Sequence, residues 1–220
     1  MGGVRSGLRQ RRKWHSQLLY VLSLILLGFG LFNLGWAVWP APTDARTFII
    51  PGGTLPGTPS GKTYASLVNY ELQVSWPRWI RAGEGGQLVF ALSEVETPAE
   101  EVLTRETQVL LMEPSLIGLP IDPPGRMQVN LGPGQALQQR WIVEGVMAGT
   151  YPGKLVVSFG FYDEALGELV PVPVAVVDFS IRVVTLWGLA RGLVLWLGVV
   201  GLVLWGALFI LGRVAAGEEG

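Results

Sequence analysis

The sequence predicts a membrane protein in which an all-β domain is flanked by two transmembrane α-helices. Two long apolar segments, residues 18–39 and 187–211, stand near the two ends of the chain. Between them, residues 64–185 alternate apolar and polar side chains in short runs, which is typical of antiparallel strands with one buried face. The chain is also 50% hydrophobic and 15% charged, with a mean hydropathy of +0.42, which is more apolar than an ordinary soluble domain.

Residues 1–17 form a basic tail that contains five Lys or Arg residues. Because Lys and Arg concentrate on the cytoplasmic side of membrane helices, the tail predicts a cytoplasmic N-terminus. Residues 18–39 follow without a charge, and as a helix they would span about 33 Å against a hydrocarbon core of about 30 Å. This segment exits through the bulky Trp39 rather than a small-residue cleavage site, so we expect an anchor helix and not a signal peptide.

Residues 40–63 are rich in Pro, Gly and Thr and predict a linker. We expect the apolar island within it, residues 48–50, to cover a domain edge or to touch a partner. The linker ends in Pro56–Thr63, which resembles a phosphate-binding loop in its last three residues. A Pro replaces the first Gly of that motif and no predicted strand precedes it, so we expect no nucleotide binding.

Residues 64–185 predict seven or eight strands, which fits two packed antiparallel sheets outside the membrane. The alternating apolar positions lie within Tyr70–Trp76, Leu88–Leu92, Val109–Leu111, Met127–Leu131, Trp141–Val143, Leu155–Phe161, Leu169–Val177 and Phe179–Val183.

Two stretches resemble parts of Ig-type sandwiches. Residues Val74 to Leu92 are similar to the opening of many bacterial Ig-like domains, with a strand, a break at Pro77, a Gly-rich turn and a second strand. Residues 148–151 resemble the tyrosine corner that precedes the sixth strand, although Pro152 departs from the usual pattern. The resemblance implies an Ig-like antiparallel sandwich in which the Tyr151 hydroxyl bonds to backbone, and it implies no activity.

Residues 186–212 predict the second transmembrane helix, and residues 213–220 predict a cytoplasmic C-terminal tail. Because no Pro or Gly lies between Asp178 and Trp187, we expect the last strand to pass into this helix with little slack. Arg191 is the one charge within residues 187–211, and we expect its side chain to reach the outer surface of the membrane. The protein would then cross a bacterial plasma membrane twice, with both termini cytoplasmic.

Each predicted helix carries a stripe of small or weakly polar residues, which allows another helix to approach closely. A second stripe on the second helix contains Gly198, Gly201 and Gly212, so we expect one stripe to contact the first helix and the other to contact a different protein. Chance is the alternative, since Gly is frequent in membrane helices. The candidate helix-packing residues are Ser23, Gly30 and Asn33 on the first helix and Gly188, Gly192 and Gly206 on the second.

An aromatic and basic cluster follows the first predicted strand of the external domain. It contains Trp76, Arg78, Trp79 and Arg81. Trp and Arg are favoured anchors of protein interfaces, so these four residues are a candidate interface patch. The alternative is a corner between strands with partly buried Trp side chains.

The residues that carry chemistry are scarce. The chain has no Cys, and its one His, His15, lies in the basic tail, which excludes thiolate metal sites and Ser-His-Asp arrangements in the external part. We therefore expect no catalytic, cofactor-binding or metal-binding residues. Residues 40–185 contain nine Lys or Arg against fifteen Asp or Glu, a net charge of −6, which argues against nucleic acid as a partner.

These observations together favour a non-catalytic accessory subunit of a multi-subunit bacterial membrane complex. Respiratory and photosynthetic electron-transfer complexes are the abundant assemblies of this kind. The expected partners are the lipid bilayer, other integral membrane subunits and extracytoplasmic subunits. The alternatives are a stand-alone membrane-anchored Ig-like module for binding or envelope assembly, and an enzyme.

Overall fold

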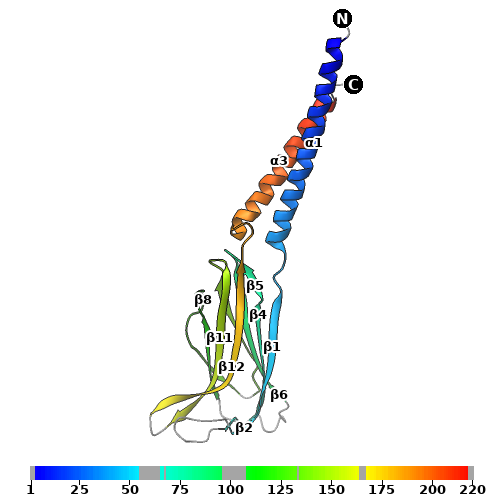
Figure 1. Cartoon of the computed structure of the whole chain (residues 1–220). Coiled ribbons are helices and arrows are strands. Elements are labelled where there is room, and N and C mark those ends of the chain that lie inside the picture. The colour runs from blue at the N-terminus through cyan, green and yellow to red at the C-terminus, as the bar shows by residue number, and fades with distance from the viewer. Residues whose placement is uncertain are drawn as a thin grey trace. The chain divides into compact units, whose positions relative to one another are not determined.

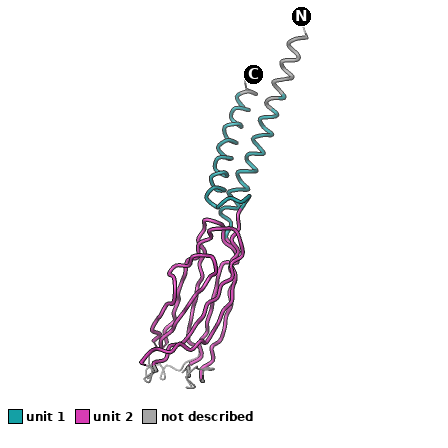
Figure 2. The backbone as a smooth tube through the Cα atoms, turned by 60° about the vertical axis from the view of Figure 1, so that its left-hand side comes forward, with its two compact units in different colours: residues 1–40, 186–220 teal, residues 41–185 magenta. Residues whose placement is uncertain are grey.

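The computed structural model describes residues 3–54, 65–66, 68–95, 108–132, 134–163 and 167–217 of the 220-residue chain. The described chain is mostly β, with two helices that are long and apolar enough to span a membrane. It divides into two compact units, coloured teal and magenta in Figure 2. The helical unit comprises residues 1–40 and 186–220, and the β unit comprises residues 41–185.

The helical unit contains α1, Gly3–Val38, and α3, Arg191–Gly217, which lie side by side (Figure 1). Their most apolar parts, Gln17–Val38 and Arg191–Val214, have mean hydropathies of 2.1 and 2.5. Only 17% of each apolar window is buried within the described structure, so the described residues leave most of its surface uncovered. An exposed apolar surface of this extent needs lipid or another protein to cover it.

The helix boundaries differ from the predicted ones. Helix α1 begins at Gly3, so the predicted basic tail is also helical, and the part of α1 apolar enough to span a membrane is Gln17–Val38, beside the predicted 18–39. Helix α3 begins at Arg191 rather than 186 and continues to Gly217 through most of the predicted C-terminal tail. A tight turn precedes α3, with positive φ angles at Trp187 and Gly188, so the last strand does not run directly into the helix.

The first sheet of the β unit has the strand order β1-β4-β6-β10-β8, and each neighbouring pair is antiparallel. Burial alternates along β4 as predicted, because alternate side chains of a strand point to opposite faces. The strands are β1 Thr43–Ile50, β4 Asn69–Pro77, β6 Gly85–Val95, β10 Leu137–Glu144 and β8 Ile121–Asp122 (Figure 1).

Strand β1 corrects the predicted linker over residues 40–63. It pairs with β4 along its whole length, from Thr43 opposite Pro77 to Ile50 opposite Tyr70. The sequence shows no alternation of apolar and polar residues here, because this edge strand is held largely by backbone hydrogen bonds. Ile50 is the one fully buried side chain in β1. The rest of the predicted linker contains β2, Gly53–Thr54, which pairs with β3, Ala65–Ser66. Pro56–Thr63, the segment that resembles a phosphate-binding loop, lies outside the described residues.

The second sheet has the order β5-β12-β11-β7-β9, in which β5 and β12 are parallel and the other pairs are antiparallel. The two strands predicted within residues 169–183 are one strand, β12, because β11 pairs with it along almost its whole length. The strands are β5 Trp79–Arg81, β12 Glu168–Val184, β11 Gly149–Asp163, β7 Gln108–Leu116 and β9 Met127–Leu131.

The core of the β unit contains side chains from both sheets. The ring of Tyr70 on β4 lies 5.4 Å from that of Phe159 on β11, and Trp76 on β4 lies 5.7 Å from Phe179 on β12. Each large apolar side chain that is buried in this way stabilises the fold by roughly 1.5–3 kcal/mol. The largest buried apolar side chains are Trp141, Phe90, Phe159, Leu72, Ile80, Leu88, Leu92, Leu110, Met112, Leu155 and Ile181.

Candidate interaction surfaces

Helices α1 and α3 meet along a seam of glycines. A Cβ atom placed on Gly30 of α1 would lie 3.0 Å from the carbonyl oxygen of Gly198 on α3. A Cβ on Gly201 would lie 3.2 Å from the Cα of Gly30. Any side chain at these positions would therefore force the helices apart, and the absence of one lets the two backbones touch.

The polar members of the α1 stripe are buried on the same helix. Ser23 and Asn33 are both almost completely buried. The Ser23 hydroxyl donates to the carbonyl oxygen of Tyr20 at 2.8 Å, and the Asn33 amide donates to that of Phe29 at 2.7 Å. These bonds give each side chain a backbone acceptor in the preceding turn of α1, which is a common arrangement of polar side chains in apolar helices.

The glycines proposed for α3 do not contact α1. Gly188 lies in the turn before the helix, with φ of 74°, so it is not part of a helical stripe, which corrects its predicted role. A left-handed backbone conformation favours Gly at that position for conformational reasons. Cβ atoms placed on Gly192 and Gly206 would meet no atom of the described residues within 4 Å. The stripe that contacts α1 is the other one, Gly198, Gly201 and Gly212.

Arg191 connects the beginning of α3 to the end of α1. Its guanidinium Nε donates to the carbonyl oxygen of Ala37 at 2.9 Å. The last carbonyl groups of a helix have no partner within the helix, so this bond supplies one. In the preceding turn, the Trp187 ring stacks on Phe29 of α1, with 5.4 Å between centroids and 10° between planes. Both contacts hold the start of α3 against α1.

The four residues of the predicted interface patch differ in exposure. Trp76 is buried against Phe179, and the Arg81 side chain is only 1% exposed. Arg78 is exposed, and Trp79 is half-buried. Pro77 ends β4 in the first sheet and β5 joins the second, so the chain crosses between the sheets here and turns alternate side chains inward. These four residues are therefore a corner between strands and do not form one accessible patch.

Two ion pairs lie at this corner. Arg81 bonds to Glu84 at 3.0 Å, and its guanidinium lies 4.8 Å from the centre of the Trp79 ring. The exposed Arg78 forms a fork with Asp44 of β1, with its closest N–O distance at 2.7 Å. The hydrogen bond from Arg78 lowers the pKa of the Asp44 carboxyl group, and the charges of Arg78 and Arg46 lower it further against a raising effect of burial.

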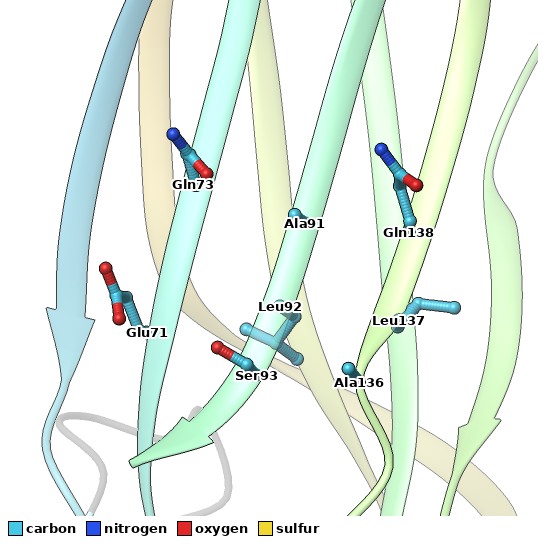
Figure 3. A pocket seen from close by; sticks show the side chains of 8 residues that line it. All are labelled: Glu71, Gln73, Ala91, Leu92, Ser93, Ala136, Leu137 and Gln138. Carbon is cyan, nitrogen blue, oxygen red and sulfur yellow. The ribbon is translucent and has the colours of Figure 1, made fainter.

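A shallow groove lies on the outer face of the first sheet (Figure 3). Ala91 on β6 forms its floor between Gln73 on β4 and Gln138 on β10, which are its partners across the sheet. Glu71 and Ser93 add a carboxylate and a hydroxyl group. The groove measures about 300 Å³ and is lined by Glu71, Gln73, Ala91, Leu92, Ser93, Ala136, Leu137 and Gln138.

Sequence patterns did not identify this groove. Its polar residues occupy the solvent-facing positions of three strands, where polar side chains are the ordinary choice. Strand pairing alone brings them together, since Gln73 and Gln138 are far apart in the sequence. Within the described parts of the chain, no three His, Cys, Asp or Glu residues gather as metal ligands would.

Comparisons with known proteins give a fold-level likeness alone. No family model matches the chain, and no curated protein matches it. Among solved structures, a CARDB domain from Pyrococcus furiosus is 13% identical, with a TM-score of 0.31, over 66% of this chain and 98% of that one. A structure of the human zinc 2-glycoprotein complex with prolactin inducible protein is 11% identical, with a TM-score of 0.37, and the match covers 51% of this chain and 93% of that one. A PapD-like domain of human CEP192 is 10% identical, with a TM-score of 0.28, and the match covers 53% of this chain and 84% of that one. The resemblance to Ig-like and PapD-like β domains is weak and says nothing about activity.

Proposed function

We propose that this protein is a non-catalytic accessory subunit of a multi-subunit complex in a bacterial plasma membrane. In this proposal α1 and α3 anchor it, and residues 41–185 form an Ig-like sandwich on the outer side. The observation that carries the proposal is the division of glycines on α3. Gly198 and Gly201 contact α1, whereas Gly192 and Gly206 leave smooth apolar surface open to another helix.

The membrane anchoring rests on length, hydropathy and charge. The apolar windows of 22 and 24 residues would span about 33 Å and 36 Å as helices, enough for a hydrocarbon core of about 30 Å. The five basic residues before the first window favour a cytoplasmic N-terminus. Two crossings then return the C-terminus to the cytoplasm and leave the β unit outside.

The absence of native Cys makes this topology directly testable. The variant Glu100→Cys should react with a membrane-impermeant maleimide in spheroplasts, whereas a Cys appended after Gly220 should react only after lysis. Labelling of Glu100→Cys that requires lysis would place the β unit inside and contradict the topology.

The sandwich assignment is supported by contacts between the sheets and by the tyrosine corner. The ring pairs Tyr70–Phe159 and Trp76–Phe179 each join a strand of the first sheet to a strand of the second. The Tyr151 hydroxyl donates to the carbonyl oxygen of Met147 at 2.9 Å, which is the kind of bond that the Ig resemblance implies.

The accessory role assigns catalysis and cofactors to partner subunits. A helix that serves purely as an anchor needs apolar bulk, and Leu would satisfy that need at every lipid-facing position. In the interior of α3, Gly206 instead lowers helix propensity by about 1 kcal/mol relative to Ala, and neither Gly192 nor Gly206 fills a contact with the described residues of this chain. Close approach of another helix would offset that cost. Respiratory and photosynthetic electron-transfer complexes are the first assemblies in which to look for the partner.

A substitution on the open face of α3 tests the accessory role. The double variant Gly192→Leu, Gly206→Leu adds bulk where the partner would approach, and it leaves the seam with α1 unchanged. We expect it to insert normally but to lose its partners in pull-downs from mild detergent. Val200→Leu, at an exposed non-glycine position of the same helix, is the matched control and should retain them. Partners that remain on the double variant at normal stoichiometry would contradict the proposed contact.

The groove on the first sheet favours a second candidate, a stand-alone binding module. Its carboxylate, hydroxyl and two carboxamide groups could hydrogen-bond a polar ligand above Ala91. Under this candidate the purified protein would be free of partners, and Ala91→Trp would abolish ligand binding by filling the floor. Under the accessory role, Ala91→Trp would leave the complex intact. The groove is polar and lies on strands β4, β6 and β10, whereas the proposed contact with the partner is an apolar face of α3.

A further inference from the structure

Three exposed apolar side chains occupy two neighbouring turns of the β unit. Ile117, Val146 and Met147 are 73%, 62% and 69% exposed, and we refer to them as the apolar tip. Single exposed apolar residues are normal on protein surfaces, but turns favour polar residues and Gly. Val146 and Met147 are consecutive, so together with Ile117 they give this surface three apolar side chains that the described residues of the unit do not cover.

Hydrogen bonds hold the apolar tip in a defined conformation. The Tyr151 hydroxyl donates to the Met147 carbonyl oxygen at 2.9 Å, and the Glu144 amide donates to the Pro120 carbonyl oxygen at 3.4 Å. The second bond ties the turn after β7 to the end of β10. Gly118 also packs closely on the Tyr151 ring, where a Cβ would lie 3.2 Å from the ring edge. The two turns are therefore joined into one surface.

The apolar tip lies at the end of the β unit where the chain leaves toward α3. The Gly83 amide donates to the carbonyl oxygen of Gly145, directly before Val146, at 2.7 Å. The preceding residue, Ala82, donates to the carbonyl oxygen of Val184 at 3.0 Å. Val184 is the last residue of β12, and α3 begins seven positions later, at Arg191.

The chain enters the β unit at the same end. Thr43, the first residue of β1, pairs with Pro77, the last residue of β4. The Arg78 amide donates to the carbonyl oxygen of Pro42 at 2.9 Å, and Arg182 of β12 pairs with Trp79. Both connections to the helices therefore leave from the end that carries the apolar tip. Along the chain, only a few residues separate this end of the β unit from the two helices that would cross the membrane.

The charges at this end suit a membrane surface. Residues 41–46, 77–86, 121–122, 142–148 and 180–185, all within the described chain, contain four Arg and four acidic residues. This end is therefore neutral, whereas residues 40–185 as a whole carry a net charge of −6. A neutral end avoids the repulsion that an acidic surface would meet at anionic lipids. The residues are Arg46, Arg78, Arg81, Arg182, Asp44, Glu84, Asp122 and Glu144.

We propose that the apolar tip is a lipid-contact site that inserts Ile117, Val146 and Met147 into the outer surface of the membrane. Apolar side chains of interfacial elements reach roughly 5–10 Å into the boundary between head groups and acyl chains. This contact would restrict the tilt of the β unit relative to the membrane and so set the orientation in which it meets a partner. The inference rests on the membrane anchoring in the proposed function and is independent of the accessory role.

Quenching by spin-labelled lipids tests the lipid contact in the full chain. Because the protein lacks Cys, the variant Met147→Cys can carry a single environment-sensitive fluorophore. The chain is reconstituted into vesicles of phosphatidylethanolamine and phosphatidylglycerol that contain lipids with a nitroxide near the head group or deep in the acyl chain. Val176→Cys is the matched control, because Val176 is 50% exposed but lies eight strand positions from Val184, about 26 Å away along β12.

We expect the label at Met147→Cys to emit at shorter wavelength than the label at Val176→Cys and to be quenched several-fold more strongly by the shallow nitroxide. A label at Leu204→Cys, an exposed position of α3, reports insertion and should respond most to the deep nitroxide. Equal quenching at residues 147 and 176, with normal quenching at 204, would overturn the lipid contact and leave the anchoring intact. Absence of quenching at 204 would overturn the anchoring and the lipid contact together. Shielding of residue 147 in the native complex, without quenching in vesicles, would identify a protein contact and also overturn the proposal.

Discussion

Gly30 of α1 and Gly198 of α3 bring two helix backbones into contact, with 3.0 Å between the Gly198 carbonyl oxygen and a Cβ placed on Gly30. Each glycine has another glycine as its neighbour across the seam, since Gly201 also packs on Gly30. Burial of apolar surface gains little inside lipid, so close packing of this kind is a main source of helix association there. We therefore expect helices α1 and α3 to pack together without the help of a partner protein.

Adding a side chain on the seam should open the helix pair. A Cβ on Gly201 would meet three backbone atoms of α1 within 3.4 Å, and backbone cannot move aside as a side chain can. Gly201→Leu should destabilise the pair by roughly 1–3 kcal/mol, the usual range for overpacking. The distance between spin labels on α1 and α3 would measure this as a broadened and longer distribution.

Gly206→Leu on the same helix is the control, since no atom in the described part of the chain lies within 4 Å of its added Cβ. It should leave the distance distribution of the isolated chain unchanged. Equal broadening of the distance distribution in both variants would show that the glycine seam does not determine how α1 and α3 pack.

The apolar segments and most strands followed from the sequence, because burial selects one side chain in two along strands such as β4. The wheel of α3 likewise revealed two glycine stripes. The sequence could not show which of the two stripes contacts α1. Periodicity identifies the residues that share a face of a helix, but it does not identify what that face contacts. Gly188 was misplaced for a related reason: its turn is as apolar as the helix that follows, and its positive φ leaves no trace in hydropathy.

The two arginines of the corner after β4 should differ strongly in their contribution to stability. The Arg81 side chain is buried and its partner Glu84 is 19% exposed, so Arg81→Gln removes a charge-assisted bond made by a buried guanidinium and should lower the free energy of unfolding by roughly 1.5–3 kcal/mol. Arg78→Gln removes an exposed pair and should have little effect. Urea unfolding of the full chain in detergent micelles, followed by Trp fluorescence, compares the two variants. Equal losses would refute the distinction between them.

The sequence could not distinguish these two arginines, because both belong to the same short aromatic and basic run. Their difference arises where the chain crosses from the first sheet to the second, after Pro77. The groove beside Ala91 was unpredictable for the opposite reason. Its residues are ordinary for a wet strand face, and their proximity depends on strand order and register.

The pair of Asp44 and Arg78 should respond to acid. The hydrogen bond from Arg78 lowers the pKa of the Asp44 carboxyl group in the folded protein. A lowered folded pKa means that the pair contributes stability above the unfolded pKa of about 3.9 and loses that contribution as the pH falls through the folded value. The chemical shift of the Asp44 carboxyl carbon, followed against pH in the full chain, should titrate below the ordinary range.

Arg78→Gln supplies the control for that titration. Removing the guanidinium should return the pKa of Asp44 toward its usual value. A carboxyl group that titrates at the same pH in both proteins would show that Arg78 does not stabilise its charged form.

Tyr151→Phe should loosen the turn that carries the apolar tip. The substitution removes the hydroxyl group that donates to Met147, and one such bond contributes about 0.5–1.5 kcal/mol. Faster amide hydrogen exchange at residues 145–148 would measure the loss. Tyr162→Phe is the matched control, because Tyr162 is exposed at the far end of β11, where it pairs with Leu169. Unchanged exchange in Tyr151→Phe would show that the corner does not hold this turn.

The native mass of the protein after extraction from its own membrane in mild detergent tests the accessory role most directly. The single chain has a mass of 23.8 kDa. We predict a larger assembly in which this chain is present at fixed stoichiometry with other membrane subunits, among them subunits that carry redox cofactors. A species of 23.8 kDa, or a multiple of it without other proteins, would contradict the accessory role and favour the stand-alone binding module.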